Sequence, residues 1–329
     1  MHQLLIPTAF APPAPPRDLP VQALHGETMG TTWSVRCVMD DDVASLRPAI
    51  ERRLERVNAE MSSWRAGSDL CRFNRLPAGG AQMLPAGFRS VIGCALATAA
   101  ATGGAFDPTM GPLVDLWGFG AVPTVHDGPP PDDEIAAALG RVGWQRLRFD
   151  AAGRLVQPGR VALDLSGIAK GYAVDLVAEG LEAVGVASYL VEIGGELGGR
   201  GVKPDGSPWW VALERPGQQG SPGYVVALHD LGVATSGDYR RRFEHGGTIY
   251  GHTIHPRSGR PTPPDIAAVT VLHRRCMQAD ALATALAVLG LPAGLDHAAR
   301  HGIAALIVAR DAAGRFIEHL SPALAAMLD

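Results

Sequence analysis

Charged residues are scarce in this chain, which argues against long disordered segments and against a nucleic-acid partner. They make up 19% of the 329 residues, against about 25% in an average globular domain, which argues against long disordered tails. The net charge is −4 and the basic residues are scattered, apart from the run at 240–242. No basic surface of the kind that binds DNA or RNA is predicted, so we expect no nucleic-acid partner.

Cysteines and long apolar runs are also few. The four cysteines form no CxxC pair, so no disulfide framework can be inferred, and a reducing compartment is the simpler interpretation. The longest apolar stretch has about 11 residues, short of the roughly 18 that a membrane span needs. Residues 1–20 lack a basic n-region and a cysteine that could carry a lipid. We interpret them as a flexible Pro-rich tail before one domain at 21–329, and expect a cytoplasmic protein unless an upstream start codon hides an export signal.

Glycine and proline, by contrast, are abundant. The chain has 40 glycines and 26 prolines, well above the usual share, so many tight turns and irregular loops must connect its elements. Such loops commonly carry binding and catalytic residues.

Hydrophobic periodicity predicts alternating strands and helices. The N-terminal half is expected to hold a strand at 28–38 and helices at 43–64 and 87–104, followed by an irregular loop at 105–120. A strand at 161–166, a helix at 167–184 and a strand at 187–195 have the pattern of a βαβ unit. The remaining predicted elements are strands at 208–215 and 223–230, a hairpin turning at Gly246-Gly247, and a strand, helix and strand at 266–273, 278–290 and 302–310.

The apolar helix QADALATALAVLG (278–290) carries one carboxylate, Asp280, and one hydroxyl, Thr284, four positions apart on one face. Asp280 could cap this helix while Thr284 bonds to a carbonyl one turn earlier. Alternatively, both oxygens could face a cation. Taken alone, the stretch favours the cap.

The segment LDLSGIAKGYAVDLVAEGL (163–181) places Asp164 at the end of a predicted strand and Lys170 in the first turn of the next helix. A lysine there is unfavourable, because cations prefer the other end of a helix, and an anionic ligand would resolve the conflict. An ordinary turn capped by Ser166, with Lys170 in water, is an equally good reading. GGELGGRG (194–201) does not open a helix, so it fails as a dinucleotide fingerprint; its glycines allow close backbone approach, line a flat ligand, or simply make turns.

Two loops carry further candidates. GHTIHPRSGRP (251–261) contains His252 and His255, which an extended segment would place on opposite faces, so a shared metal is improbable. One of them could be a general base, although a structural histidine is the commoner case. In FDPTMGP (106–112), Phe106 and Asp107 could grip a flat aromatic ligand, or form a buried Phe and an Asx-turn.

Eight segments together, in this order, resemble the ApbE-type FAD:protein FMN transferase family over residues 28 to 290. They are TMGTTWSV, MSSWRAGSDLCRFN, GGAFDPTMGPLVDLWGFG, DLSGIAKGYAVD, YLVEIGGELGGRG, ATSGDYRR, GHTIHPRSGRP and CMQADALATALAVLG. The resemblance implies an α/β (α+β) fold of mixed sheets with packed helices, in one two-lobed catalytic unit that holds FAD and a metal between the lobes.

The resemblance also implies an activity. Such an enzyme takes FAD, transfers FMN through its phosphate to a Thr or Ser hydroxyl of an acceptor flavoprotein, and releases AMP with the help of Mg²⁺. Asp280, Thr284 and the Gly167 carbonyl look like the metal ligands, and His252 and Lys170 are the catalytic candidates. The implied FAD contacts are Met29, Trp64, Ala105, Phe106, Asp107, Asp164, Lys170, His252 and Thr253.

Two departures from the family pattern stand out. Relatives usually carry Asp or Asn before the proline of the histidine turn, where this chain has His255, a group that can titrate near neutrality. The lipid-bearing cysteine of many exported relatives is missing. Two alternative functions use the same features: an Mg²⁺-dependent FAD pyrophosphatase that gives FMN and AMP, and a flavin-binding module without chemistry.

Overall fold

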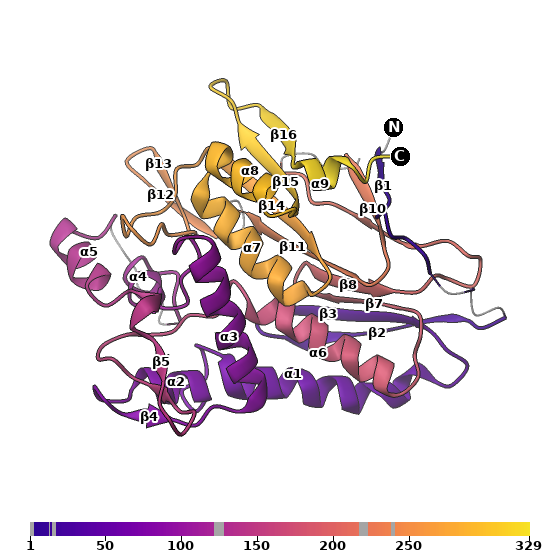
Figure 1. Ribbon diagram of the computed structural model, residues 1–329, viewed down its shortest axis with the longest axis horizontal. Coiled ribbons are helices and arrows are strands. Elements are labelled where there is room, and N and C mark those ends of the chain that lie inside the picture. The colour runs from indigo at the N-terminus through magenta and orange to yellow at the C-terminus, as the bar shows by residue number, and fades with distance from the viewer. Residues whose placement is uncertain (1–2, 13, 15–17, 122–127, 217–222, 238–240) are drawn as a thin grey trace.

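The computed structural model describes residues 3–12, 14, 18–121, 128–216, 223–237 and 241–329. Its centre is an eight-stranded sheet in the order β16-β15-β14-β11-β8-β7-β3-β2 (Figure 1), in which every neighbouring pair is antiparallel. The strands are β2 (Val21–Thr28), β3 (Thr31–Val38), β7 (Tyr189–Ile193), β8 (Glu196–Arg200), β11 (Leu231–Gly237), β14 (Ile266–His273), β15 (Ala304–Arg310) and β16 (Phe316–Leu320).

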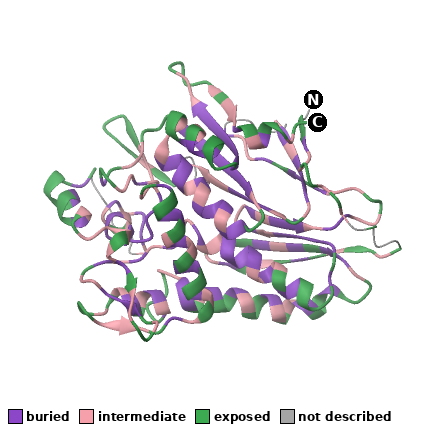
Figure 2. Ribbon diagram, in the orientation of Figure 1, coloured by how far each residue is buried: buried purple, intermediate pink, exposed green. Residues whose placement is uncertain are grey.

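Helices cover one face of this sheet, and a small sheet covers part of the other. The helical layer holds α1 (Arg47–Met61), α3 (Ala86–Ala101), α6 (Ala169–Ala183), α7 (Cys276–Leu289) and α8 (Leu291–Arg300). Opposite it lie β1 (Gln3–Leu5), β10 (Tyr224–Leu228), β9 (Trp209–Ala212) and α9 (Pro322–Ala325). Figure 2 shows buried residues concentrated along α7 and the central strands, where these layers meet.

The glycines of GGELGGRG form a tight turn and let the layers pack closely against β8. Gly194 and Gly195, with φ of 61° and 101°, make the two-residue turn between β7 and β8. A Cβ on Gly198 would lie 2.9 Å from Val174 of α6, and one on Gly199 would lie 2.7 Å from Leu228 of β10. The structure therefore confirms two of the predicted alternatives. The first glycines make a tight turn, and the later ones allow neighbouring elements to approach β8 closely on both of its faces.

A smaller part of the chain adjoins one end of the central sheet, at the left of Figure 1. A four-residue 3₁₀ turn (Val43–Leu46) leads into α1 of the main layer. The smaller part contains α2 (Asp69–Asn74), α4 (Gly111–Leu116), α5 (Asp132–Leu139), the 3₁₀ turn Trp144–Arg146, and the short strands β4 (Ala81–Gln82), β5 (Arg148–Phe149) and β6 (Leu155–Val156). The hairpin β12 (Arg242–His245) and β13 (Thr248–Gly251) packs on α4 through Phe243, Tyr250 and Trp117. The predicted fold of mixed sheets with packed helices is confirmed, as is the turn at Gly246-Gly247.

Three local predictions were wrong. Residues 161–166 form no strand and no βαβ unit: on one side they make a single parallel bridge, Ala162 with Met110, and on the other the side-chain amide of Asn74 bonds both the N–H and the C=O of Leu163. The loop at 105–120 contains α4, which begins with Pro112 in its first turn, a position that tolerates proline.

The third wrong prediction concerns the Pro-rich N-terminal segment, which is in part a strand. Residues 3–5 pair in parallel with β10, and Leu5 is completely buried. The apolar start of the chain thus completes the small sheet. Among the helices that the structure describes, none has the length and apolar content of a membrane-spanning segment.

Helices α6 and α7 run antiparallel in close contact. Gly167 faces Thr284, Gly171 faces Asp280, and Asp175 faces Cys276, so one helix descends by one turn as the other rises by one turn. A Cβ on Gly171 would lie 2.4 Å from the carbonyl oxygen of Cys276. Only glycine at 171 lets the backbones come this close.

Each of these helices is capped by a carboxylate of the other. Asp175 of α6 accepts hydrogen bonds from the first two amides of α7, Cys276 (2.9 Å) and Met277 (3.1 Å). Asp280 of α7 accepts the amide of Gly171 in the first turn of α6 (3.0 Å). Neither helix has a side-chain cap from its own N-cap residue, so the pair depends on mutual capping.

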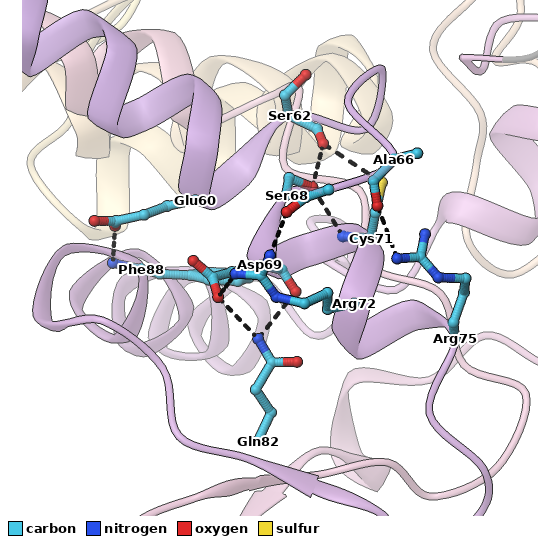
Figure 3. A network of polar contacts seen from close by, with 11 residues as sticks. Glu60, Ser62, Ala66, Ser68, Asp69, Cys71, Arg72, Arg75, Gln82 and Phe88 are labelled. Atoms are coloured by element: carbon cyan, nitrogen blue, oxygen red, sulfur yellow. Dashed lines mark hydrogen bonds and ion pairs between the residues drawn. The ribbon is translucent and has the colours of Figure 1, made fainter.

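The N-terminus of α3 is likewise capped by a carboxylate from another helix. Glu60, near the end of α1, accepts the amide of Phe88 in the first turn of α3 (3.1 Å), as Figure 3 shows. Its burial raises the pKa of the Glu60 carboxyl. A Cβ on Gly87 would meet the Tyr172 hydroxyl at 2.4 Å and Glu60 Oε2 at 3.1 Å. Glycine at 87 therefore makes room for this cap.

The turn with the unusual His255 is well formed. His255 Nδ1 accepts the amide of Arg257 (3.1 Å), the bond that an Asp or Asn oxygen makes in an Asx-turn. Its own amide donates to Arg260 O (2.8 Å), and its carbonyl accepts from Gly259 (2.9 Å). Burial and the nearby Arg257 lower the pKa of His255, which keeps the ring neutral and Nδ1 an acceptor.

Removal of the α7 cap should destabilise the fold. Replacement Asp175→Ala leaves two amides of α7 without their acceptor, and we expect the free energy of unfolding in urea to fall by about 2 kcal/mol. Glu179→Ala is the matched control, because Glu179 is exposed and forms an ion pair with the same Arg275; its loss should stay below about 1 kcal/mol. Equal losses would contradict the capping role.

His255 should make stability depend on pH. The folded state disfavours the protonated ring, whereas the unfolded chain takes up the proton near the ordinary pKa of 6.5. Urea unfolding should therefore show the wild type losing stability relative to His255→Asn as pH falls through about 6.5, with parallel curves above it. The same comparison for His25→Asn, on an exposed strand position, is the control for replacing a histidine by asparagine. A pH-independent difference would exclude this role.

Candidate active site

A cavity of about 270 Å³ lies where the smaller part of the chain meets the N-terminus of α6 and the middle of α7. The loop before α4, the start of α6, the end of β11 and the segment after β13 all contribute to it. Its lining residues are Ala105, Phe106, Asp107, Met110, Val114, Asp164, Ser166, Gly167, Lys170, Glu196, Thr235, Ser236, Gly237, Arg241, His252, Thr253, Ile254, Pro256, Asp280, Thr284 and Val288.

The cavity brings together residues that are far apart in the sequence. Every site residue predicted from the sequence lies in its wall except Met29 and Trp64. The predicted metal group (Gly167, Asp280, Thr284) faces the loop with Phe106 and Asp107 and the segment with His252 and Thr253.

Met29 and Trp64 lie outside this wall. Met29 occupies the turn between β2 and β3, with φ of 51°, and packs on the main core. Trp64 is 62% exposed, on the loop between α1 and α2. That loop is fixed by Ser68, whose hydroxyl donates to Ser62 O (2.7 Å) and caps α2 (Figure 3). Neighbouring Ser63 lines a second cavity, which also contains Asp164.

The two readings of the 278–290 helix are both modified by the structure. Asp280 is 4% exposed and is indeed a cap, but of α6 and not of its own helix. The hydroxyl of Thr284 lies 3.1 Å from that of Ser236 on β11. A Cβ on Gly167 would lie 2.7 Å from Thr284 Oγ1, so the backbone at 167 and this hydroxyl are neighbours.

Lys170 has an internal anionic partner that the sequence reading missed. Its Nζ donates to Glu196 Oε1 at 2.5 Å. Ser166 is not the cap of α6; its amide donates to Asp164 Oδ1 instead (2.7 Å). Burial and the neighbouring Asp280 raise the pKa of Glu196 to about 7, against the opposing effect of Lys170. Burial also raises the pKa of Asp280, while Lys170 and the Gly171 amide oppose the rise.

The donor set at this end of the cavity fits a hard divalent cation. The residues present offer the Asp280 carboxylate, the Thr284 hydroxyl and the adjacent backbone of Gly167, and Mg²⁺ is usually held by one or two carboxylates together with waters and substrate phosphates. Among the described residues, Glu196 Oε2 is buried without a hydrogen-bond partner. No group of three or more His, Cys, Asp or Glu side chains with metal-binding geometry occurs in the described ranges, so a cage built from protein carboxylates alone does not form.

The loop opposite is organised by Asp107. Its Oδ1 accepts the amide and hydroxyl of Thr109 (2.8 and 2.6 Å), and its Oδ2 accepts the amide of Trp144 (3.1 Å). This is the Asx-turn considered from the sequence. Burial raises the pKa of Asp107. The amide of Asp164 donates to Pro108 O (2.9 Å), which fixes the loop against the start of α6.

His252 follows β13 directly and has a defined orientation. Its Nδ1 lies 3.2 Å from the carbonyl oxygen of Arg241, an atom that can only accept. The neutral ring therefore carries its hydrogen on Nδ1, and the lone pair lies on Nε2. Phe119 contacts the ring edge-on, with centroids 6.2 Å apart.

Sequence reasoning missed Glu196, Ser236 and Arg241 as cavity residues. Glu196 follows the glycine turn that was examined only for its glycines, and an isolated Glu at a strand start carries no local signal. Ser236 and Arg241 belong to the ATSGDYRR segment, of which residues 238–240 lie outside the described ranges.

Comparison with known proteins gives one consistent result. The model of the ApbE family matches residues 29–307. The FAD:protein FMN transferase of Vibrio cholerae serotype O1 is 38% identical over 300 residues, covering 89% of each chain. The protein of the same name from Haemophilus influenzae is 36% identical, covering 89% of this chain and 88% of its own.

Solved structures agree. The apo form of the flavinyl transferase ApbE from Pseudomonas stutzeri superposes with a TM-score of 0.87 at 42% identity, covering 94% of this chain and 97% of that one. The flavin transferase ApbE from Vibrio cholerae gives a TM-score of 0.86 at 36% identity, covering 94% and 100%. The chain therefore belongs to the ApbE family of flavin transferases and is a transferase enzyme.

Proposed function

We propose that this enzyme transfers FMN from FAD to a Thr or Ser hydroxyl of an acceptor flavoprotein, with Mg²⁺, and releases AMP. The observation that carries the proposal is the convergence on one cavity of the Asp280, Thr284 and Gly167 group with Lys170 and His252. The names of the matched relatives support the same reaction.

The cation end of the cavity would take the pyrophosphate of FAD. Asp280, Thr284 and the Gly167 carbonyl are the proposed ligands, and Mg²⁺ bound there would neutralise charge on the phosphates. Lys170, held against Glu196 (2.5 Å), supplies a fixed positive charge at the N-terminus of α6. The dipole of that helix adds to the attraction for a phosphate. Phe106 and Asp107, with Ala105, Asp164 and Thr253, are proposed to contact the rest of FAD.

His252 is the proposed general base. Its Nε2 lone pair takes the proton of the acceptor hydroxyl, the oxygen bonds to the phosphorus of the FMN half, and the bond from that phosphorus to the bridging oxygen breaks. AMP leaves with the bridging oxygen. Phe119 and the Arg241 carbonyl hold the ring for this role.

Incubation with FAD, Mg²⁺ and a flavin-acceptor protein tests the reaction as a whole. A fluorescent covalent band on a denaturing gel, with one AMP released per flavin attached, is the expected result. EDTA should abolish the band. Free FMN and AMP without a band would instead identify a pyrophosphatase, and FAD binding without release of AMP would identify a passive binder.

Asp280 should be separable from its capping role. Asp280→Asn retains an oxygen that can accept the Gly171 amide, so the melting temperature without metal should not fall, while transfer should drop by about 100-fold or more because the anionic ligand is lost. Asp175→Asn is the matched control, since it alters the reciprocal cap outside the cavity, and its transfer rate should stay near that of the wild type. Full transfer by Asp280→Asn would remove Asp280 from the ligand set.

His252 is tested by its truncation. His252→Ala should lower covalent transfer by roughly 10² to 10⁴-fold at saturating FAD, the range typical of a lost general base. His255→Asn, three residues along the same segment but outside the cavity wall, should transfer flavin at the wild-type rate. A fully active His252→Ala with normal FAD binding would show that another group takes the proton.

A further inference from the structure

Glu196 is the most deeply buried carboxylate in the cavity wall, with a relative exposure of 2%. The turn at Gly194-Gly195 places it as the first residue of β8, opposite Ile193. One of its oxygens binds Lys170, whereas the other, Oε2, has no hydrogen-bond partner among the residues that the structure describes. A buried carboxylate oxygen without a partner is costly, so this position calls for a ligand.

The electrostatic surroundings indicate the sign of that ligand. Glu196 and Asp280 repel one another, and both are stabilised as anions by Lys170. Two buried carboxyl groups thus share one lysine in the cavity wall that also contains Thr284 and Gly167. A positively charged group, or a donor polarised by one, would satisfy Oε2.

We propose that Glu196 Oε2 accepts a hydrogen bond from a water molecule coordinated to the divalent cation of this site, so that Glu196 is a positioning residue for the metal. The inference rests on the proposed function, because it takes Asp280 and Thr284 as ligands. Mg²⁺ loses its waters reluctantly and keeps several of them in protein sites. Such waters donate, a carboxylate outside the ligand shell accepts, and such outer contacts typically change metal affinity 10–100-fold.

Holding Lys170 does not by itself account for Glu196. That contact is made through Oε1, and it accounts for a negative charge at this position. It leaves the second oxygen, Oε2, buried without a hydrogen-bond partner among the described residues, and that oxygen is what a metal-bound water would satisfy. Glu196→Gln keeps an acceptor for Lys170 but removes the charge, so in metal-free buffer its stability should stay close to that of the wild type, because the lost repulsion with Asp280 offsets the weaker bond to Lys170.

The experiment is a titration with Mn²⁺ alone, without FAD, followed by the electron paramagnetic resonance of free Mn²⁺. Glu196→Gln should bind Mn²⁺ about 10–100-fold more weakly than the wild type. Glu60→Gln is the matched control, because Glu60 is also a buried carboxylate and caps α3 outside the cavity; its affinity should be unchanged. Thermal melts of each variant without metal verify that the fold is intact.

Lys170→Met separates the two contacts of Glu196 and does not require the Gln variant to fold. If Glu196 acts on the metal through water, loss of Lys170 leaves Mn²⁺ affinity equal or higher when it is measured at a pH high enough to keep both carboxylates ionised, because a competing positive charge is gone. A fall in affinity matching that of Glu196→Gln would overturn the inference and assign Glu196 to Lys170 alone.

The remaining outcomes are decisive as well. Wild-type affinity in Glu196→Gln overturns the inference. A loss as complete as that of Asp280→Asn overturns it too, since Glu196 would then be a direct ligand. If Asp280→Asn itself binds Mn²⁺ like the wild type, the proposed metal ligands are wrong and the inference falls with them. If Asp280→Asn loses binding while Glu196→Gln keeps it, the proposed function survives and the role of Glu196 does not.

Discussion

The antiparallel contact between α6 and α7 governs the geometry of this protein. Gly167 and Gly171 let the two backbones meet, and Asp175 and Asp280 supply the caps that each helix lacks on its own. The N-terminus of α6 is thereby fixed beside the middle of α7, and the cavity opens at that junction. An error of one turn in this register would separate Thr284 from Gly167 and leave the first amides of both helices without acceptors.

The same contact concentrates charge where an anionic substrate and its cation would be bound. A carboxylate that caps a helix start is stabilised by the helix dipole, and Asp280 does this while lining the cavity. Glu196 brings a second buried carboxylate, with only one lysine shared between them. Such an arrangement is unfavourable by itself, as functional sites often are, and the surrounding core of apolar helix and sheet contacts maintains it.

Much of the local structure could be predicted from the apolar pattern, since α1 and α3 bury apolar residues at helical spacing, whereas α7 is an apolar run of helical length that is buried on most of its sides. Strand pairing could not. The segment 161–166 has the composition of a strand, yet its backbone makes only an isolated bridge to Met110 and bonds to the side chain of Asn74, which is far away in the sequence. In the same way, Glu196 carried no signal, because its partners Lys170 and Asp280 lie on other elements.

The sequence by itself determined the four long helices α1, α3, α6 and α7, the hairpin turn at Gly246-Gly247, the motifs that resemble one family, and about half of the residues of the cavity wall. These depend on local spacing or on residue types that few other sites combine. Only the tertiary structure decided that Asp280 caps a helix other than its own, that His255 Nδ1 replaces an Asx oxygen, and that Trp64 stands outside the cavity wall. Each of those facts depends on which distant backbone amide or side chain a residue meets, and that is settled by packing rather than by its neighbours in the chain.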